Sequence, residues 1–193
     1  MGETFFVTKD GLAVVRSYPG APAAVALSEV LIATRIHRLV ILGEAGSISP
    51  KIGVGEILVP TFAIREEGTS YHYLPPNTEA KPSFTLLKKI KVLLNQMNVP
   101  HREGGVWTTD APFRETMDKV LSYSRAGVVA VDMECSAIFC LSMYRCVESA
   151  AILVITDTLY EGVWSTAFQE PKVTDIEKRI SEILVKYWNR LAK

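Results

Sequence analysis

Acidic residues follow three apolar runs in this sequence. Apolar runs of four or five residues are typical of buried strands, and a carboxylate at the end of such a run is costly to bury in a core. Ligands bind beyond the carboxyl ends of the strands in open α/β sheets, so these acids indicate a site. If the three strands are parallel neighbours, the acids surround one crevice. The acidic residues are Glu44, Asp132, Glu134 and Asp157, and the runs that they follow are 39–42, 128–131 and 152–156.

Hydrophobic periodicity predicts strands that alternate with helices along the chain. This alternation indicates a sheet covered on both faces, so we expect one α/β domain over residues 1–193, with a mixed, mostly parallel central sheet flanked by helices. We expect a loop at residues 46–50 and a long ordered loop or covering flap at residues 65–82. The expected strands are 5–7, 12–15, 39–42, 57–60, 105–108, 128–131 and 152–156, with a hairpin turn at 9–11; the expected helices are 22–36, 84–97, 114–123, 135–144 and 173–191.

The composition excludes several classes of partner. Lys plus Arg (21) equals Asp plus Glu (21), so there is no basic excess to bind nucleic acid or an anionic membrane. The N-terminus has no apolar signal-peptide core, and the apolar runs are far shorter than a membrane span. We therefore expect a cytoplasmic protein. A mean hydropathy of +0.18 fits either a large core or a subunit interface.

The cysteines and histidines do not form a metal-binding pattern. Cys135, Cys140 and Cys146 lie on or just after one expected helix, with spacings unlike those of a zinc site. We expect them to be buried thiols. The three histidines are scattered. The sequence therefore predicts no metal and no organic cofactor.

Several motifs together resemble those of a known family. Val131 to Ala137 reads V-D-M-E-C-S-A, which resembles the V-[ED]-M-E-x-x-A signature of the nucleoside phosphorylase and nucleosidase family. That family includes purine nucleoside phosphorylase, uridine phosphorylase and methylthioadenosine nucleosidase. The other similar segments are 42–47 (the G-[TS]-x-G loop), 54–60 (V-G-D-[IV]-[LV]-[VI]-P), 67–73 (D-G-[TA]-S of the uridine branch) and 156–157 (S-D of the purine branch).

The resemblance implies cleavage of an N-glycosidic bond. That reaction leaves positive charge on the sugar in an oxocarbenium-like transition state, which a carboxylate on the ribose hydroxyls favours. Glu134 takes this role by resemblance, with Met133 against the ribose. Asp157 takes the role of proton donor to N7 of a purine. Taken alone, Asp157 at a strand end is more often a helix cap or turn residue.

The base-binding group implied by the resemblance lies in residues 107–114. The family stacks an aromatic residue on the base here. Pro112 stands nearest to that position, so we expect Phe113 to shift into the role. Trp107, Arg114 and Asp132 complete the expected group. The alternative is that Trp107 and Phe113 are core aromatics and that Arg114 is a surface charge.

The phosphate site departs from the family pattern. Gly43, Ala45 and Gly46 keep the loop, but Glu44 replaces its hydroxyl residue and Ile41 stands where the family has an arginine. A carboxylate there repels phosphate by roughly 1 to 4 kcal/mol. The G-x-G-x-P-S segment reads Y-P-G-A-P-A over residues 18–23. The chain is also expected to lack the family's first strand.

Three functions remain open at this point. The first is a phosphorylase with phosphate as co-substrate, held by Arg16, Arg65, Arg114 or a partner subunit. The second is a phosphate-independent nucleosidase in which Glu44 activates water. The third is a nucleoside-binding homologue without catalysis. Asp157 favours a purine substrate, whereas the segment 68–73 favours uridine. By resemblance we expect a homo-oligomer, either a dimer or a dimer-based hexamer, that binds a small-molecule nucleoside.

Overall fold

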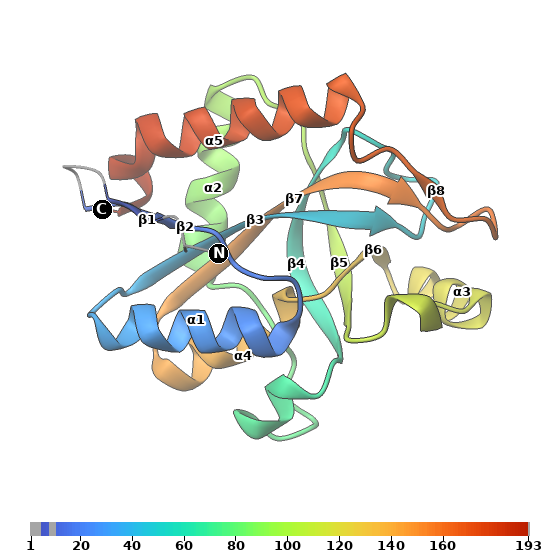
Figure 1. Cartoon of the computed structure of the whole chain (residues 1–193), viewed down its shortest axis with the longest axis horizontal. Helices are drawn as coiled ribbons and strands as arrows, with labels where there is room; N and C mark the ends of the chain where they lie inside the picture. Colours follow the sequence, from blue (N-terminus) through green and yellow to red (C-terminus); the bar gives the residue numbers. More distant parts are fainter. Residues whose placement is uncertain (1–4, 8–10, 193) are drawn as a thin grey trace.

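The strands form a mixed sheet that closes on itself (Figure 1). The structure is a computed structural model that describes residues 5–7 and 11–192. Its main sheet has the order β3-β6-β5-β4-β7-β8, and β3 also pairs with β7. The strands are β3 (Arg38–Ser47), β4 (Ile57–Glu66), β5 (Arg102–Thr109), β6 (Val128–Asp132), β7 (Glu148–Thr158) and β8 (Ser165–Thr166).

The long ladders of this sheet are parallel, as predicted. They join β3 to β7, β4 to β5, and β5 to β6. The antiparallel ladders, β3–β6, β4–β7 and β7–β8, are short and span two residue pairs each. Because β3 pairs with both β6 and β7, the sheet closes instead of staying open. The three strands that end in acids are therefore neighbours, but β6 runs antiparallel to β3.

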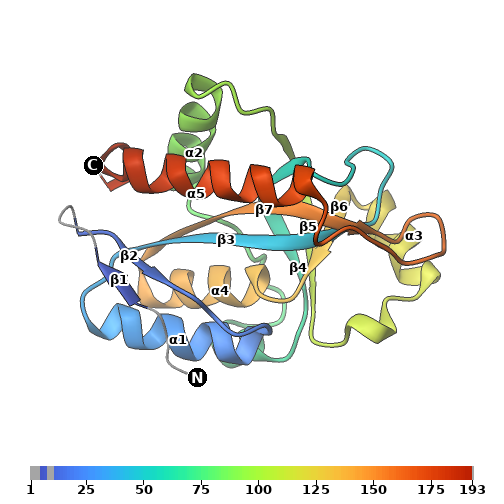
Figure 2. The same ribbon diagram turned by 45° about the horizontal axis from the view of Figure 1, so that its top comes forward.

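Helices cover the sheet on two sides (Figures 1 and 2). One pair, α1 and α4, lies on one side, and the other pair, α2 and α5, lies opposite, while α3 stands near the ends of β7 and β8. The long α5 has a marked apolar face that buries Ile180 and Ile183 against the core. The helices are α1 (Ala21–Ala33), α2 (Phe84–Gln96), α3 (Met117–Arg125), α4 (Cys135–Arg145) and α5 (Pro171–Ala192).

The strand β3 is longer than its apolar run. The expected strand ended at residue 42 and the expected loop began at residue 46, but the parallel ladder with β7 continues to Ser47. Gly43, Ala45 and Gly46 pair with residues of β7 and therefore belong to a strand. This corrects the expected start of the loop at residue 46, while the role of these residues in phosphate binding stays a prediction.

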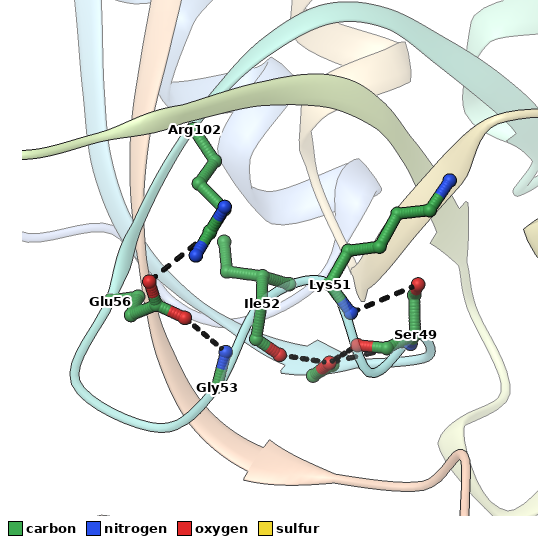
Figure 3. A network of polar contacts seen from close by, with 7 residues as sticks. Ser49, Lys51, Ile52, Gly53, Glu56 and Arg102 are labelled. Atoms are coloured by element: carbon green, nitrogen blue, oxygen red, sulfur yellow. Dashed lines mark hydrogen bonds and ion pairs between the residues drawn. The ribbon is translucent and has the colours of Figure 1, made fainter.

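A network of polar contacts fixes the turn between β3 and β4 (Figure 3). Ser47 Oγ lies 2.8 Å from the Ser49 carbonyl oxygen and 2.7 Å from that of Ile52. The Glu56 carboxylate accepts a hydrogen bond from the Gly53 N–H at 2.7 Å and one from Arg102 Nε at 3.1 Å. The turn is thus tied both to the end of β3 and to the start of β5.

The remaining segments differ from the sequence expectations in detail. The hairpin is present as β1 (Phe5–Val7) and β2 (Ala13–Val15), and residues 9 and 10 of its expected turn at 9–11 lie outside the described residues. The long segment after β4 contains the short helix η1 (Thr69–His72). The strand β8 was not predicted. Cys135 and Cys140 are buried, but Cys146 is exposed at a left-handed C-cap of α4. No helix in the described ranges is long and apolar enough to cross a membrane.

Candidate active site

Three strands bring the segments that carry Asp132, Glu134 and Asp157 to one end of the sheet. Gly46 of β3 pairs with Asp157 of β7 on one side and with Val131 of β6 on the other. Val131 precedes Asp132, so β3 connects the segment that carries Glu134 with the one that carries Asp157. The approach is close: a Cβ atom on Gly46 would lie 2.7 Å from Asp157 Oδ2.

Asp157 is almost buried and accepts two side-chain hydrogen bonds. It is 7% exposed. Thr156 Oγ1 donates to Oδ1 at 3.0 Å, and Trp164 Nε1 donates to Oδ2 at 2.7 Å. The two donors therefore fix the orientation of the Asp157 carboxyl group at the end of β7.

A second carboxyl group belongs to this end of the sheet. Glu115 lies between the short helix η2 (Pro112–Arg114) and α3. Burial raises the pKa of Glu115 to about 7, and the negative charges of Asp157 and Glu66 add to the effect, while Lys119 opposes it. Lys119 is paired with Glu66. A group with this pKa holds or releases a proton near neutral pH.

Asp132 organises the start of α4. Its Oδ2 accepts the N–H groups of Glu134 and Cys135 at 3.2 and 2.7 Å, and its Oδ1 accepts Thr108 Oγ1 at 2.6 Å. Burial raises its pKa, and these hydrogen bonds oppose the rise. Both carboxylate oxygens serve the fold here. In this geometry Asp132 fixes the backbone from which Met133 and Glu134 project.

Glu134 is held by the segment that leads into α1. Its Oε1 accepts the backbone N–H of Gly20 at 2.6 Å. Gly20 is the N-cap of α1 with φ of +101°, a conformation that favours glycine, and no side chain caps this helix. A carboxylate near a helix N-terminus is stabilised by the unpaired N–H groups there. Burial nonetheless raises the pKa of Glu134.

A cavity adjoins this contact. Its volume is about 540 Å³, within the usual range for small-molecule sites. Pro22 and Val25 of α1 line one side, Thr69 and His72 of η1 another, and Asp110 a third. Pro22 is two residues from Gly20, so the cavity lies next to the chain that holds Glu134.

The aromatic residues of the expected base-binding group have opposite environments. Trp107 has no exposed surface, its Nε1 donates to Glu66, and its ring lies 4.9 Å from that of Tyr123. Trp107 is thus a core aromatic, and no face of its ring is open to a base. Phe113 is 91% exposed, and its neighbours Pro112 and Arg114 are also exposed.

Glu44 lies on the side of the sheet that carries α5. Burial raises the pKa of Glu177 of that helix, and the nearby carboxyl group of Glu44 adds to the rise. Glu44 is exposed. The side-chain hydrogen bonds of Asp157 come from Thr156 of β7 and from Trp164, which lies between β7 and β8. The structure therefore does not bring Glu44 into the contacts made by Asp157 or Glu134.

Arg65, one of the candidates for phosphate binding, is buried in a different role. Its guanidinium donates to Ser70 Oγ, to the Leu74 carbonyl, and to the carbonyls of Pro75 and Thr78, at 2.6 to 2.9 Å. It thereby holds the loop after β4 in place. Arg16 and Arg114 are exposed.

Sequence reasoning missed three residues of the site. Gly20 contacts Glu134 through its backbone, which leaves no side-chain signal. Glu115 directly follows Arg114 of the expected base-binding segment, and this acidic neighbour could have indicated a site residue. Trp164 follows Asp157 by seven residues, and a tryptophan so soon after a candidate acid was a further signal. Within the described residues, no group of histidine, cysteine and acidic side chains has an arrangement that could hold a metal.

The chain is similar in sequence to nucleoside phosphorylases. It is 29% identical over 147 residues to the uridine phosphorylase of Treponema pallidum, a match that covers 70% of this chain and 57% of that protein. It is 27% identical over 150 residues to a DeoD-type purine nucleoside phosphorylase of Bacillus cytotoxicus, covering 77% of this chain and 64% of that protein. The chain thus spans about three-fifths of the length of these curated relatives.

Solved structures share the fold. The purine nucleoside phosphorylase of Toxoplasma gondii in complex with immucillin-H superposes with a TM-score of 0.85 at 20% identity, over 95% of this chain and 76% of that one. The uridine phosphorylase of Vibrio fischeri superposes with a TM-score of 0.81 at 26% identity, over 95% of this chain and 77% of that one. The family model of the phosphorylase superfamily matches residues 2–189, and the chain belongs to that superfamily.

Proposed function

We propose that this protein cleaves the N-glycosidic bond of a nucleoside, with phosphate as the nucleophile. The observation that carries the proposal is the register at Gly46, which joins the strand bearing Asp157 to the strand that leads to Glu134. The ribose and the base of a nucleoside need two groups of this kind, set apart on one rim. Family membership supports the same reaction class.

Glu134 is the proposed ribose ligand. Gly20 occupies Oε1, which leaves Oε2 to accept hydrogen bonds from ribose hydroxyls. Met133 is half-buried beside it and offers an apolar contact to the sugar. A carboxylate here stabilises the positive charge that develops on the ribose as the bond to the base breaks.

Asp157 is the proposed acid for the leaving base. A phosphate oxygen attacks C1′, the bond from C1′ to the base nitrogen breaks, and the proton of Asp157 moves to N7 of the purine. The products are free base and ribose 1-phosphate. Asp157 is left as a carboxylate that Thr156 and Trp164 already hydrogen-bond.

Phe113 and Arg114 are the proposed contacts to the base from the 107–114 segment, with Pro112 beside them, because all three are exposed. The proposal does not use Trp107, Asp132 or Glu44. Trp107 is fully buried, Asp132 accepts the N–H groups at the start of α4, and Glu44 acts on the pKa of Glu177.

Hydrolysis by water is the second candidate. It is favoured by the use of Arg65 as a loop clamp and by Ile41, which packs against the core and offers an anion no donor. These two positions supply no cation for phosphate. Under hydrolysis Glu134 and Asp157 keep their roles, and ribose replaces ribose 1-phosphate as product.

The test incubates the purified protein with inosine, adenosine, methylthioadenosine and uridine, each with and without phosphate. Base released only with phosphate, together with ribose 1-phosphate, supports phosphorolysis; base released without phosphate supports hydrolysis. Asp157→Asn and Glu134→Gln should each lower cleavage at least about 100-fold. The control Asp175→Asn changes an exposed acid of α5 and should not. Full activity in both site variants refutes the assignment.

We also infer that the protein is a cytoplasmic homo-oligomer without an organic cofactor, on family resemblance. Light scattering on the purified chain tests the oligomeric state, and a monomer that cleaves nucleosides at full rate contradicts it.

A further inference from the structure

Trp164 is an exposed aromatic residue that is anchored to the proposed acid. Its side chain is 56% exposed, yet its Nε1 donates to Asp157 Oδ2 at 2.7 Å. The hydrogen bond fixes one edge of the indole beside Asp157 and leaves much of the ring in solvent. An aromatic ring held this way is an open stacking surface next to a carboxyl group.

The segment that carries Trp164 lies over the start of α3. Gly162 has φ of +82° and its N–H donates to the Leu159 carbonyl at 3.0 Å, so the chain turns there. A Cβ atom on Gly162 would lie 3.9 Å from Met117 Sδ. Val163 is 71% exposed and Met117 36%. Partly exposed apolar side chains therefore lie where this segment meets α3.

A nucleobase matches this surface in two respects. Its planar ring stacks on an aromatic side chain, and a purine offers N7 as a partner for Asp157. Base–aromatic stacking adds affinity for any base, because every base has a flat π-face. The indole N–H donates to Asp157 Oδ2, whereas N7 accepts the carboxyl proton, so Asp157 can contact the indole and the base at the same time.

We propose that Trp164 recognises the base: its ring stacks on the purine, while its N–H keeps its hydrogen bond to Asp157. This inference rests on the proposed function, because it assigns a further base-contacting residue of the same site, beside Phe113 and Arg114. After the proton has moved to N7, the indole N–H donates to the resulting carboxylate.

Binding of free hypoxanthine tests the assignment without requiring cleavage. Titration of the wild-type protein should quench tryptophan fluorescence. In Trp164→Phe the remaining tryptophans are Trp107 and Trp188, so quenching should disappear, while the Kd measured by calorimetry should stay within about threefold because a ring is kept. Trp164→Leu should raise Kd roughly 10- to 100-fold because stacking is lost.

The matched control is Phe168→Leu, which removes another aromatic side chain of the same chain segment, 43% exposed. Its Kd should equal that of the wild type. Circular dichroism of each variant shows whether it has folded. Should Trp164→Leu fold poorly, the loss of quenching in Trp164→Phe still decides the question.

The outcomes separate this inference from the proposed function. Unchanged quenching in Trp164→Phe, an unchanged Kd in Trp164→Leu, or no binding of hypoxanthine to the wild type each overturns the role of Trp164. A dependence of base binding on the Trp164 ring, in a protein that cleaves no nucleoside, supports the role and refutes cleavage. Normal nucleoside cleavage with an unchanged KM in Trp164→Leu supports cleavage and refutes the role of Trp164.

Discussion

Gly46 and Asp157 are packed so closely that no side chain fits between them. A Cβ atom on Gly46 would lie 2.7 Å from Asp157 Oδ2 and 2.8 Å from Leu159 Cδ1. These distances are shorter than van der Waals contact, so any residue larger than glycine must move Asp157. The position of the Asp157 carboxyl group on β7 therefore requires glycine at residue 46 of β3.

Gly46→Ala should lower nucleoside cleavage at least about 100-fold, because a shift of the acid by an ångström is costly to catalysis. Overpacking should also lower the free energy of unfolding by about 1 to 3 kcal/mol. Steady-state kinetics and urea unfolding measure the two effects. Gly43→Ala is the control on the same strand, since its Cβ would lie 3.4 Å from Leu153 Cδ2, an ordinary contact. Equal kinetics in both variants contradict the packing argument.

The contact between Gly20 and Glu134 predicts a pattern of hydrogen exchange. Glu134→Ala removes the acceptor of the Gly20 N–H, and hydrogen bonds to charged groups contribute about 1.5 to 3 kcal/mol. Exchange of the Gly20 amide should therefore accelerate roughly 10- to 100-fold, while that of Val25, inside α1, should not. Amide exchange followed by NMR measures both.

Glu29→Ala is the matched control for this experiment. Glu29 lies on α1 itself and bonds to Arg145 and Tyr73 instead. Its loss should leave the Gly20 amide unchanged. Slow exchange at Gly20 in Glu134→Ala would mean that another group protects this amide.

Site residues could be predicted where the local sequence pattern marks them, but not where their position depends on which strands pair. Asp157 and Glu134 follow apolar runs, and the strands predicted from those runs are present. The extension of β3 through Gly46 is different, because it depends on β6 and β7, whose positions beside β3 no local pattern encodes. The face occupied by Glu44 was unpredictable for the same reason.

Burial of individual side chains was the other limit. Trp107 and Phe113 lie six residues apart, and both are aromatic. Trp107 lies inside β5 and faces the core, whereas Phe113 follows the strand and is exposed. Arg65 resembles a surface cation in the sequence. Only the folded loop supplies the carbonyl groups that bury it.

Glu115 predicts a dependence of stability on pH. The pKa of Glu115 is about 7 in the folded protein and 4.5 in its ordinary state, so the folded protein binds this proton more tightly than the unfolded chain. The resulting stabilisation is complete below pH 4.5 and is lost as the pH rises through 7. The full shift would correspond to about 3 kcal/mol; partial exposure reduces it to about 1 to 2 kcal/mol.

Glu115→Gln removes this titration. The variant should be more stable than the wild type at pH 8 by about 1 to 2 kcal/mol, and the difference should shrink towards pH 5. Urea unfolding at both pH values measures it. Glu161→Gln, which changes an exposed acid, should show no such trend. A Glu115→Gln variant less stable than the wild type at pH 8 would show that the charged carboxylate is favoured there.

A variant of Arg65 can distinguish a structural role of this residue from a role in phosphate binding. Its guanidinium donates four hydrogen bonds to the loop after β4, and its cation lies 4.4 Å from the centre of the Tyr71 ring. A lysine keeps the charge but cannot reach acceptors on so many sides. Arg65→Lys should therefore lower the free energy of unfolding by about 3 kcal/mol, because buried carbonyl groups lose their donors.

Urea unfolding and proteolysis of the loop measure the loss, with Arg125→Lys, at the exposed end of α3, as the control. A phosphate ligand predicts a different result. In that case Arg65→Lys would keep the stability of the wild type and raise the KM for phosphate alone. Because the guanidinium already faces Ser70 and three carbonyl groups, we expect instead that stability falls and that the KM for phosphate stays the same in the fraction that remains folded.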